Sequence, residues 1–523
     1  MKVHLLHESR DFDFTADPPA QHEDLTQDLD LPTLLRAMAG DDNYLLDVAR
    51  RVVLAGLADP AEVLYRQAVL ADCMAQPDIV RDIYAIAVAM VQDKTSRWWH
   101  VSSKNPAWTL SSAVQYLEVA LSRLKELRGI ADERSGRVES AGFRAFFRSL
   151  QTELDDEYFQ VVRRHLRQLQ FREGVLISAR LDRDNSSIDL VLRAQNDERQ
   201  GLLQHLGLGK REAYSFTVPT RDDAGWQGLE NLKSRAINRV ANAAAQSADH
   251  ILSYFAMLRA ELGFYLGCLR LREQLIGKGV SIAFPAPAPW RPARFAATGL
   301  REVCLALRSD EPVVGNDADA NERPLVIVTG ANSGGKSTFL RSVGLARLML
   351  GCGMFVAAER LEASVLPGGV FTHFAREEDR SMTSGRLDEE LTRMSTLADR
   401  LRPGSLVLFN ESFASTNELE GSEIARQVVR ALLEADIQVA FVTHQFDLAD
   451  GFHKSHADSA LFLRAEPGLG GQRTYRLVEG PPLATSFGED LYYRIGGWLD
   501  ETPSEAPPPG REVLRSPVGR PDS

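Results

Sequence analysis

The stretch from Thr329 to Thr338 constrains the fold of this chain more than any other feature. It reads Thr-Gly-Ala-Asn-Ser-Gly-Gly-Lys-Ser-Thr and satisfies the pattern G-x-x-x-x-G-K-S of phosphate-binding loops. The apolar run 324–328 before it is typical of a buried strand, and residues 339–350 after it have helical spacing. A strand, this loop and a helix are the context that the pattern requires. The sequence therefore predicts an α/β domain with a phosphate site.

Each part of this loop has an expected task in binding ATP and Mg²⁺. Glycines allow the backbone amides to turn inward around a phosphate, and the N-terminus of the next helix adds partial positive charge. Lys336 is expected to reach the β- and γ-phosphates, and the hydroxyl of Ser337 to ligate Mg²⁺. The residues predicted to bind the cofactor here are Gly330, Ala331, Asn332, Ser333, Gly334, Gly335, Lys336, Ser337 and Thr338.

Two later apolar runs end in polar groups that suit ATP hydrolysis. Residues 406–409 are followed by Asn410 and Glu411, and residues 439–443 by His444. Groups past the carboxyl ends of strands line the ligand crevice of an open α/β sheet. Glu411 is predicted to polarise the attacking water, and His444 to contact the γ-phosphate. The plainer alternatives are a core strand that ends in polar residues and a structural histidine.

Asn410 is the second predicted metal-site residue, beside Ser337. It stands where an ATPase of this kind carries an aspartate as an outer partner of Mg²⁺. A neutral amide binds a cation less strongly than a carboxylate does. We therefore expect slow hydrolysis.

The remainder of the chain divides by periodicity and composition. Helical spacing dominates residues 31–283 and includes one long helix near 228–277, whereas residues 174–181 and 188–194 alternate as in a hairpin. The proline-rich stretch 284–292 ends the helical pattern and predicts a stiff connector. The predicted divisions are an acidic disordered arm (1–30), a helical core and lever region (31–283) with a hairpin-containing insertion at about 174–225, an α/β P-loop ATPase domain (284–499) and a disordered proline-rich tail (500–523).

The formal net charge of −12 argues against a protein that coats nucleic acid by bulk charge. Most of that charge lies in residues 1–30 and 500–523, so the body between them is nearly neutral and local contact with DNA stays open. The candidate phosphate contacts are Arg163, Arg164, Arg167, Arg172, Lys233, Arg235 and Arg239, with solvated helix faces as the alternative.

The sequence favours a soluble, cytoplasmic protein that does not cross a membrane. The four cysteines are far apart, which fits a reducing compartment. The polar N-terminus does not resemble a signal peptide. The longest clean apolar run, 83–91, is much shorter than the roughly 20 residues of a membrane span.

Several further segments follow the loop in a set order. Residues 370–374 read Val-Phe-Thr-His-Phe, and residues 384–391 read Ser-Gly-Arg-Leu-Asp-Glu-Glu-Leu. Residues 410–421 read Asn-Glu-Ser-Phe-Ala-Ser-Thr-Asn-Glu-Leu-Glu-Gly, and residues 441–444 read Phe-Val-Thr-His. Residues 475–480, Tyr-Arg-Leu-Val-Glu-Gly, precede Ser-Phe-Gly at 486–488. With the loop, they resemble the ATPase domain of the MutS-type mismatch repair family, a branch of the ABC-like ATPases.

This resemblance implies a head-to-tail homodimer in which residues 384–391, the signature segment, complete the partner's nucleotide site. Ser384 or Gly385 would face the partner's γ-phosphate, and both stay candidates. The resemblance also implies helical levers that carry the nucleotide state to bound DNA. The chain departs from the family pattern at Asn410, and it lacks the family's mismatch-reading domain.

Two functions therefore remain open. The first is an ATP-dependent, MutS-like, DNA-binding protein in mismatch repair or a related DNA transaction. The second is a nucleotide-switched interaction protein that docks on a ribosome, a structured nucleic acid or a protein partner, hydrolyses ATP slowly and recognises no mismatch. A metabolite kinase is a weaker third possibility, because it would need neither the signature segment nor the long helices.

Overall fold

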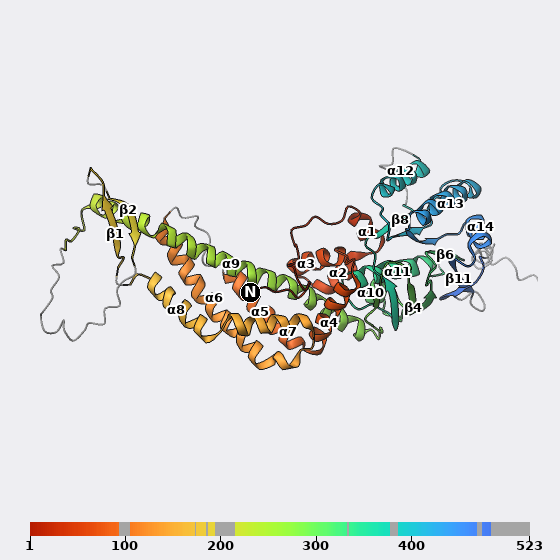
Figure 1. Cartoon of the computed structure of the whole chain (residues 1–523). Helices are drawn as coiled ribbons and strands as arrows, with labels where there is room; N and C mark the ends of the chain where they lie inside the picture. The colour runs from red at the N-terminus through yellow and green to blue at the C-terminus, as the bar shows by residue number, and fades with distance from the viewer. Residues whose placement is uncertain are drawn as a thin grey trace, which may run out of the picture.

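The computed structural model joins an elongated helical region to a mixed α/β region (Figure 1). It describes residues 1–93, 105–172, 174–184, 187–193, 215–331, 334–376, 385–467 and 473–482. Among these residues, no helix has both the length and the apolar content needed to span a membrane. The predicted tail lies outside the described residues.

The helical region is built from helices with polar caps and apolar faces. Asp42, Asp59 and Asp155 each accept hydrogen bonds from amides in the first turn of the helix that follows, which satisfies donors left free at a helix start. The elements are α2 (Leu31–Ala39), α3 (Asn43–Leu54), α4 (Pro60–Ala75), α5 (Pro77–Asp93), α6 (Pro106–Arg134), the 3-10 turn η2 (Ser135–Arg137), α7 (Ala141–Glu153), α8 (Asp156–Leu169) and α9 (Asp223–Gly277).

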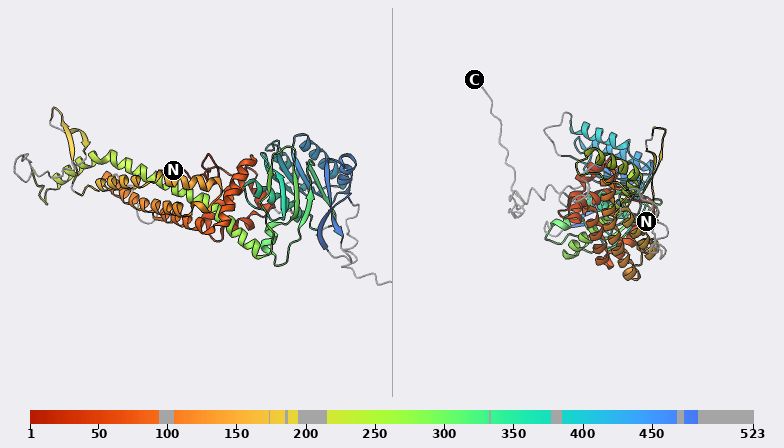
Figure 2. Two further views of the ribbon diagram at one scale, coloured as in Figure 1. Left: turned by 60° about the horizontal axis from the view of Figure 1, so that its bottom comes forward. Right: turned by 90° about the vertical axis from the view of Figure 1, so that its left-hand side faces the viewer.

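The long helix and the hairpin predicted from the sequence are both present. Helix α9 has 55 residues, or about 80 Å at 1.5 Å per residue, and it packs against α5 and α6. Strands β1 (Ile177–Leu181) and β2 (Ser187–Leu192) pair antiparallel. They lie at the end of α9 that is remote from the α/β region (Figures 1 and 2).

The α/β region contains a six-stranded and a four-stranded sheet. In the larger sheet the order is β12-β11-β6-β10-β9-β8, and only β12 runs antiparallel to its neighbour. The order of the smaller sheet is β3-β7-β4-β5. The bounds are β3 (Ala286–Ala288), β4 (Phe295–Leu300), α10 (Val303–Arg308), β5 (Asn316–Asp319), β6 (Leu325–Thr329), α11 (Lys336–Gly351), β7 (Arg360–Ser364), β8 (Gly369–Phe374), α12 (Arg386–Ala398), β9 (Ser405–Asn410), α13 (Glu418–Glu434), β10 (Gln438–Val442), α14 (Phe446–His456), β11 (Ala460–Pro467) and β12 (Arg473–Glu479).

The stretch 284–292 is more than a connector. Helix α9 already ends at Gly277, before the first of these prolines, and Ala286–Ala288 forms β3, which pairs in parallel with β7. Proline is tolerated on an edge strand because one side of such a strand makes no ladder bonds, and β3 is at the edge of its sheet. The stretch therefore belongs to the α/β region as part of its smaller sheet.

The prediction that residues 1–30 form a disordered arm is wrong. Leu5 and Leu6 are fully buried, and their amides donate to Oε2 of Glu261 on α9 at 2.6 and 3.1 Å. Further along, α1 (His22–Asp28) contacts β8 of the large sheet. We call residues 3–28 the N-terminal strap. Its acidic side chains stay at the surface or pair with arginines, while its apolar side chains enter the core.

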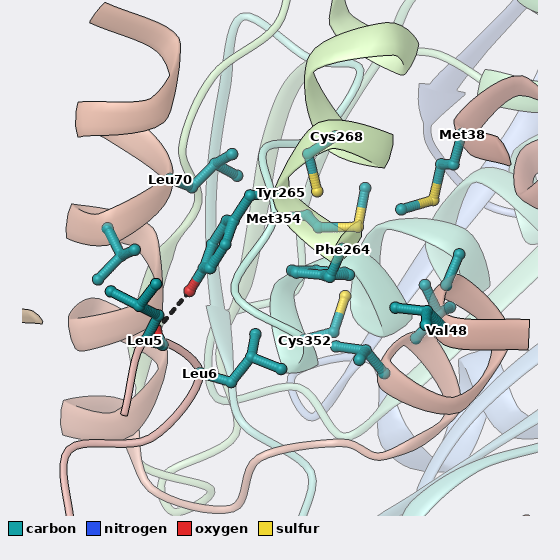
Figure 3. Packing of buried hydrophobic residues seen from close by; sticks show 14 of the residues in the cluster. Leu5, Leu6, Met38, Val48, Leu70, Phe264, Tyr265, Cys268, Cys352 and Met354 are labelled. Atoms are coloured by element: carbon teal, nitrogen blue, oxygen red, sulfur yellow. Dashed lines mark hydrogen bonds between the residues drawn. The ribbon is translucent and has the colours of Figure 1, made fainter. Parts of the chain in front are cut away.

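The core around the C-terminal part of α9 joins the two regions of the molecule. Figure 3 shows Phe264 and Tyr265 among buried side chains from several elements, including Cys352 just after α11. The hydroxyl of Tyr265 donates to the carbonyl of Leu5 at 2.6 Å. Arg66 of α4, which is fully buried, donates to the carbonyls of Leu6 and Cys352. The strap, the long helix and the end of α11 thus share one core.

Candidate active site

The glycine-rich loop leaves β6 and enters α11 through backbone that favours glycine. Gly330 has a φ of +118° and Gly335 a φ of +90°, both in the left-handed region. A Cβ at Gly330 or Gly334 would lie 2.9 Å from the Cβ of Ala465 on β11. These glycines therefore allow the loop to fold closely against the neighbouring strand. Two predicted members of the loop, Asn332 and Ser333, lie outside the described residues.

Lys336 is a buried cation at the first position of α11. Only 5% of its surface is exposed, and its Nζ donates to the carbonyls of Gly330 at 2.7 Å and Ala331 at 3.3 Å. Burial lowers the pKa of Lys336, and Glu411, whose Oε1 lies 3.6 Å from Nζ, opposes that shift. In the part of the chain that the structure describes, no side chain caps the N-terminus of α11. The loop therefore presents an ammonium group and helix amides to the same space.

Ser337 and Asn410 meet across the site. The Ser337 hydroxyl donates to Oδ1 of Asn410 at 2.7 Å, which links the start of α11 to the carboxyl end of β9. Both side chains offer neutral oxygen atoms, the type of ligand that Mg²⁺ accepts. The two predicted metal-site residues are thus brought together, and their donor chemistry fits that ion.

Glu411 and His444 form a hydrogen-bonded pair after β9 and β10. Glu411 has a left-handed φ of +52°, and its amide donates to the carbonyl of Val442 at 2.9 Å. Its Oε2 accepts from the amide of His444 at 3.0 Å and lies 2.7 Å from Nδ1 of the same residue. This hydrogen bond raises the pKa of His444. Both predicted catalytic side chains therefore lie at one edge of the sheet, with His444 directly against Glu411.

A cavity of about 670 Å³ opens at this edge. From the predicted set it is lined by Gly334, Gly335, Lys336, Ser337, Thr338 and Glu411. Its other wall was missed by the sequence analysis and comprises Leu305, Ser309, Glu311, Pro312, Val313, Val314, Asn316 and Tyr475. No local pattern marks these residues, because they reach the cavity from two separate segments. Gly385 is an exposed residue at the start of α12 and does not line the cavity, and Ser384 lies outside the described residues.

Asn316 fixes the position of Tyr475 in this wall. Its Nδ2 donates to the carbonyl of Tyr475 at 3.2 Å, and its Oδ1 accepts from the amide of Leu477 at 2.7 Å. These two bonds tie β12 of the large sheet to β5 of the small one. Tyr475 has a φ of +56° and is half exposed. Both sheets therefore contribute to the cavity.

The fold and the site define a mixed α/β protein with a glycine-rich loop, a buried lysine and a glutamate–histidine pair around one cavity. Family comparisons give a more specific assignment. Residues 58–277 match the MutS2 N-terminal domain, and residues 326–487 match MutS domain V. The second match contains the glycine-rich loop, Asn410, Glu411 and His444. The chain belongs to the MutS family.

Curated relatives match over parts of their length. The chain is 26% identical over 186 residues to the endonuclease MutS2 of Streptococcus equi subsp. equi, covering 35% of this chain and 24% of that protein. It is 27% identical over 315 residues to the endonuclease MutS2 of Thermomicrobium roseum, covering 56% and 36%. It is 33% identical over 223 residues to the DNA mismatch repair protein MutS of Porphyromonas gingivalis, covering 38% and 25%. The chain thus spans about a quarter to a third of the length of these relatives.

Proposed function

We propose that this protein is an ATPase that binds ATP with Mg²⁺ in the cavity at the carboxyl edge of the large sheet. The observation that carries the proposal is one cavity lined by Lys336, Ser337 and Glu411. Asn410 is bonded to Ser337 and His444 to Glu411, although neither lines the cavity itself. These groups come from three neighbouring strands or the turns after them. A bound Mg²⁺ would be held by Ser337 and Asn410, and it would neutralise charge on the phosphates.

The contacts of Lys336 and Glu411 suggest how the site changes on binding. In this structure Nζ of Lys336 donates to two backbone carbonyls and lies 3.6 Å from Oε1 of Glu411. A phosphate in the cavity offers the ammonium group a stronger, charged acceptor. Glu411 Oε1 is then free to accept a proton from the attacking water, while Oε2 keeps its bonds to His444. His444 holds the carboxylate in orientation, and the neutral Asn410 makes hydrolysis slow.

Lys336→Ala tests nucleotide binding. We expect it to lower ATP affinity by about 100-fold or more, because it removes the buried cation that faces the phosphates. Fluorescent-ATP titration measures the affinity, and Lys454→Ala, which changes an exposed lysine on α14, is the matched control. Unchanged affinity in Lys336→Ala would show that ATP does not occupy this loop.

Glu411→Gln tests catalysis. We expect turnover to fall by about 100-fold or more while ATP binding is retained, because the amide cannot accept the proton of the attacking water. Phosphate release measures turnover, and Glu423→Gln on the exposed face of α13 is the control. If Glu411→Gln hydrolysed ATP at the wild-type rate, Glu411 would not be the base.

We further propose that the protein forms a homodimer and that its helical region carries the nucleotide state to DNA. The curated relatives named as MutS and MutS2 support this proposal, and so does the unbroken helix α9 between the shared core and the hairpin. Exposed arginines on α8, namely Arg163, Arg164 and Arg167, offer local phosphate contacts. Their charge is partly balanced by Asp156 and Glu157 at the start of the same helix.

The salt dependence of DNA binding separates this function from a nucleotide-switched scaffold. A DNA-binding protein loses affinity with a log–log slope of about −0.9 for each neutralised phosphate, whereas a scaffold shows no DNA affinity at physiological salt. Replacing the three α8 arginines with glutamine should lower the magnitude of that slope by up to about 3. An unchanged slope would place the contact elsewhere. Asn410 predicts slow hydrolysis, which is also what the scaffold function requires. DNA affinity is therefore measured both with and without ATP.

A further inference from the structure

The turn that carries Glu411 is held in place by groups outside its own strand. We call residues 411–413 the catalytic turn. Ser412 and Phe413 are fully buried, and Phe413 has a left-handed φ of +61°. The carbonyl of Phe413 accepts from Nε2 of Gln445 at 3.1 Å, and Gly421 packs so closely against that carbonyl that a Cβ would clash with it. Two consecutive residues after Glu411 are therefore enclosed by protein.

Glu390, on α12, provides the acceptor for the amide of this turn. Its Oε2 accepts from the amide of Phe413 at 2.8 Å, and its side chain is only 4% exposed. Burial raises the pKa of Glu390, and the bond from Phe413 opposes that shift. A buried carboxylate is costly unless it satisfies a donor. The donor satisfied here lies two residues after Glu411.

His373, on β8, joins the same network. Its Nε2 lies 3.1 Å from the carbonyl of Glu390, and its Nδ1 lies 2.8 Å from Oγ of Ser412. A carbonyl can only accept, so Nε2 of the ring donates to the carbonyl of Glu390, and the hydroxyl of Ser412 donates to the backbone carbonyl of His373 at 2.5 Å. The ring also stacks on Phe413, with centroids 5.3 Å apart. Helix α12, strand β8 and the catalytic turn are thus linked by one set of buried contacts.

We propose that Glu390 is a positioning residue that sets the orientation of Glu411 through the catalytic turn, and that it carries the position of α12 to that turn. The inference rests on the proposed ATPase function. Glu390 lies five residues after Gly385, which is little more than one helical turn. A displacement of the start of α12 would therefore move the acceptor that holds the turn of Glu411.

Three substitutions at Glu390 separate positioning from general packing. Glu390→Met keeps nearly the same side-chain size but offers no oxygen to the amide of Phe413. Glu390→Gln keeps an oxygen acceptor at the same distance. Glu390→Asp keeps the charge, but its side chain is one methylene shorter, so the acceptor lies farther from that amide. Glu423→Met is the control, because Glu423 lies on the exposed face of α13, outside the signature segment, and pairs with Arg426. The full-length proteins are compared for ATP affinity with a fluorescent analogue and for kcat by phosphate release, after their melting temperatures are measured.

We expect Glu390→Met and Glu390→Asp to bind ATP within about twofold of wild type while kcat falls about 10- to 100-fold, because a misplacement near 1 Å costs about that much. Glu390→Gln should recover kcat to within about threefold, and Glu423→Met should match wild type. If Glu390→Met fails to fold, Glu390→Asp decides. Wild-type kcat in Glu390→Asp, or a loss in Glu390→Gln equal to that in Glu390→Asp, would overturn the proposal.

The failure of this inference differs from the failure of the proposed function. If the wild-type protein neither binds nor hydrolyses ATP, the function itself is wrong. If the wild type turns ATP over and Glu411→Gln does not, but the Glu390 variants keep the wild-type kcat, only the positioning role is wrong. A parallel loss of ATP affinity and kcat in Glu390→Asp would also count against it, because positioning of the base affects kcat alone.

Discussion

The two ends of helix α9 are stabilised in different ways. Near its C-terminal end, residues 254–275 bury aromatic and branched side chains, among them Phe255, Phe264 and Tyr265. Near the hairpin, the buried positions of 236–248 are four alanines and Ile237. Trp226 and Leu229, at the start of the helix, remain 45% and 41% exposed.

We call residues 254–275 of α9 its fixed end and residues 223–248 its yielding end, because large buried side chains pack the first and small or exposed side chains the second. Large buried side chains contribute most of the stabilisation that burial of apolar area gives, whereas a narrow alanine stripe contributes little. The fixed end also bonds to the strap and shares a core with the residue after α11, the helix that carries Lys336. The end of α9 that lies nearest the α/β region is therefore its most tightly packed part, and its packing is weakest near the hairpin.

The largest expected difference between the two ends comes from truncating an apolar side chain at each of them. Phe264→Ala should lower the free energy of unfolding by about 3–5 kcal/mol, because Phe264 is fully buried and leaves a cavity. Leu229→Ala, at an exposed site, should change it by less than about 1 kcal/mol. Denaturant unfolding followed by circular dichroism measures both. Equal losses would remove the distinction between a fixed and a yielding end.

A pH titration sharpens the account of the fixed end. Burial raises the pKa of Glu261 from 4.5 to about 7. Between these values the folded protein binds more protons than the unfolded chain, so stability falls as pH rises through this window and levels off above it. This pKa shift corresponds to up to about 3 kcal/mol. Glu261→Gln cannot ionise, so it should be more stable than wild type at pH 8 and should lose this slope.

The control for that titration is Glu273→Gln, on the exposed side of the same helix, where Glu273 pairs with Arg81. Its stability should follow the wild-type pH dependence. The charged neighbours that influence Glu261 are Asp11, which favours its neutral form, and Arg66, which favours its ionised form. Parallel pH curves for wild type and Glu261→Gln would mean that Glu261 does not titrate in this range.

The smallest expected effect compares one substitution at both ends. Gly228→Ala places a Cβ where nothing lies within 4 Å, so the better helix former should stabilise the yielding end by about 0.5–1 kcal/mol. Gly267→Ala would place a Cβ 3.2 Å from Cβ of Met38 and should lose that gain. Amide hydrogen exchange resolves the local change at each end. If Gly267→Ala stabilised the protein as much as Gly228→Ala, the packing around Gly267 would have space for a methyl group and would not be tighter than at the other end.

The sequence predicted those parts of the fold and site that depend on short, local patterns. The glycine-rich loop, the residues after β9 and β10, the long helix and the hairpin are each contained within one run of residues. The strap was mispredicted because disorder was inferred from its acidic composition alone. The amides of Leu5 and Leu6 bond to Glu261, which lies more than 250 residues away and cannot be paired with them from a local pattern. Tyr475 and Glu390 were missed for the same reason, since their contacts form only in the folded chain.

The N-terminal strap has a consequence for the order in which the chain folds. Its residues leave the ribosome early, yet Leu5 must wait for Glu261, 256 residues later, and Asp24 must wait for Arg376, 352 residues later. At about 5–20 residues per second, these partners appear only after tens of seconds. The strap therefore cannot dock before these partners have been made, and until then Leu5 and Leu6 are exposed to the solvent and to any chaperone that binds apolar segments.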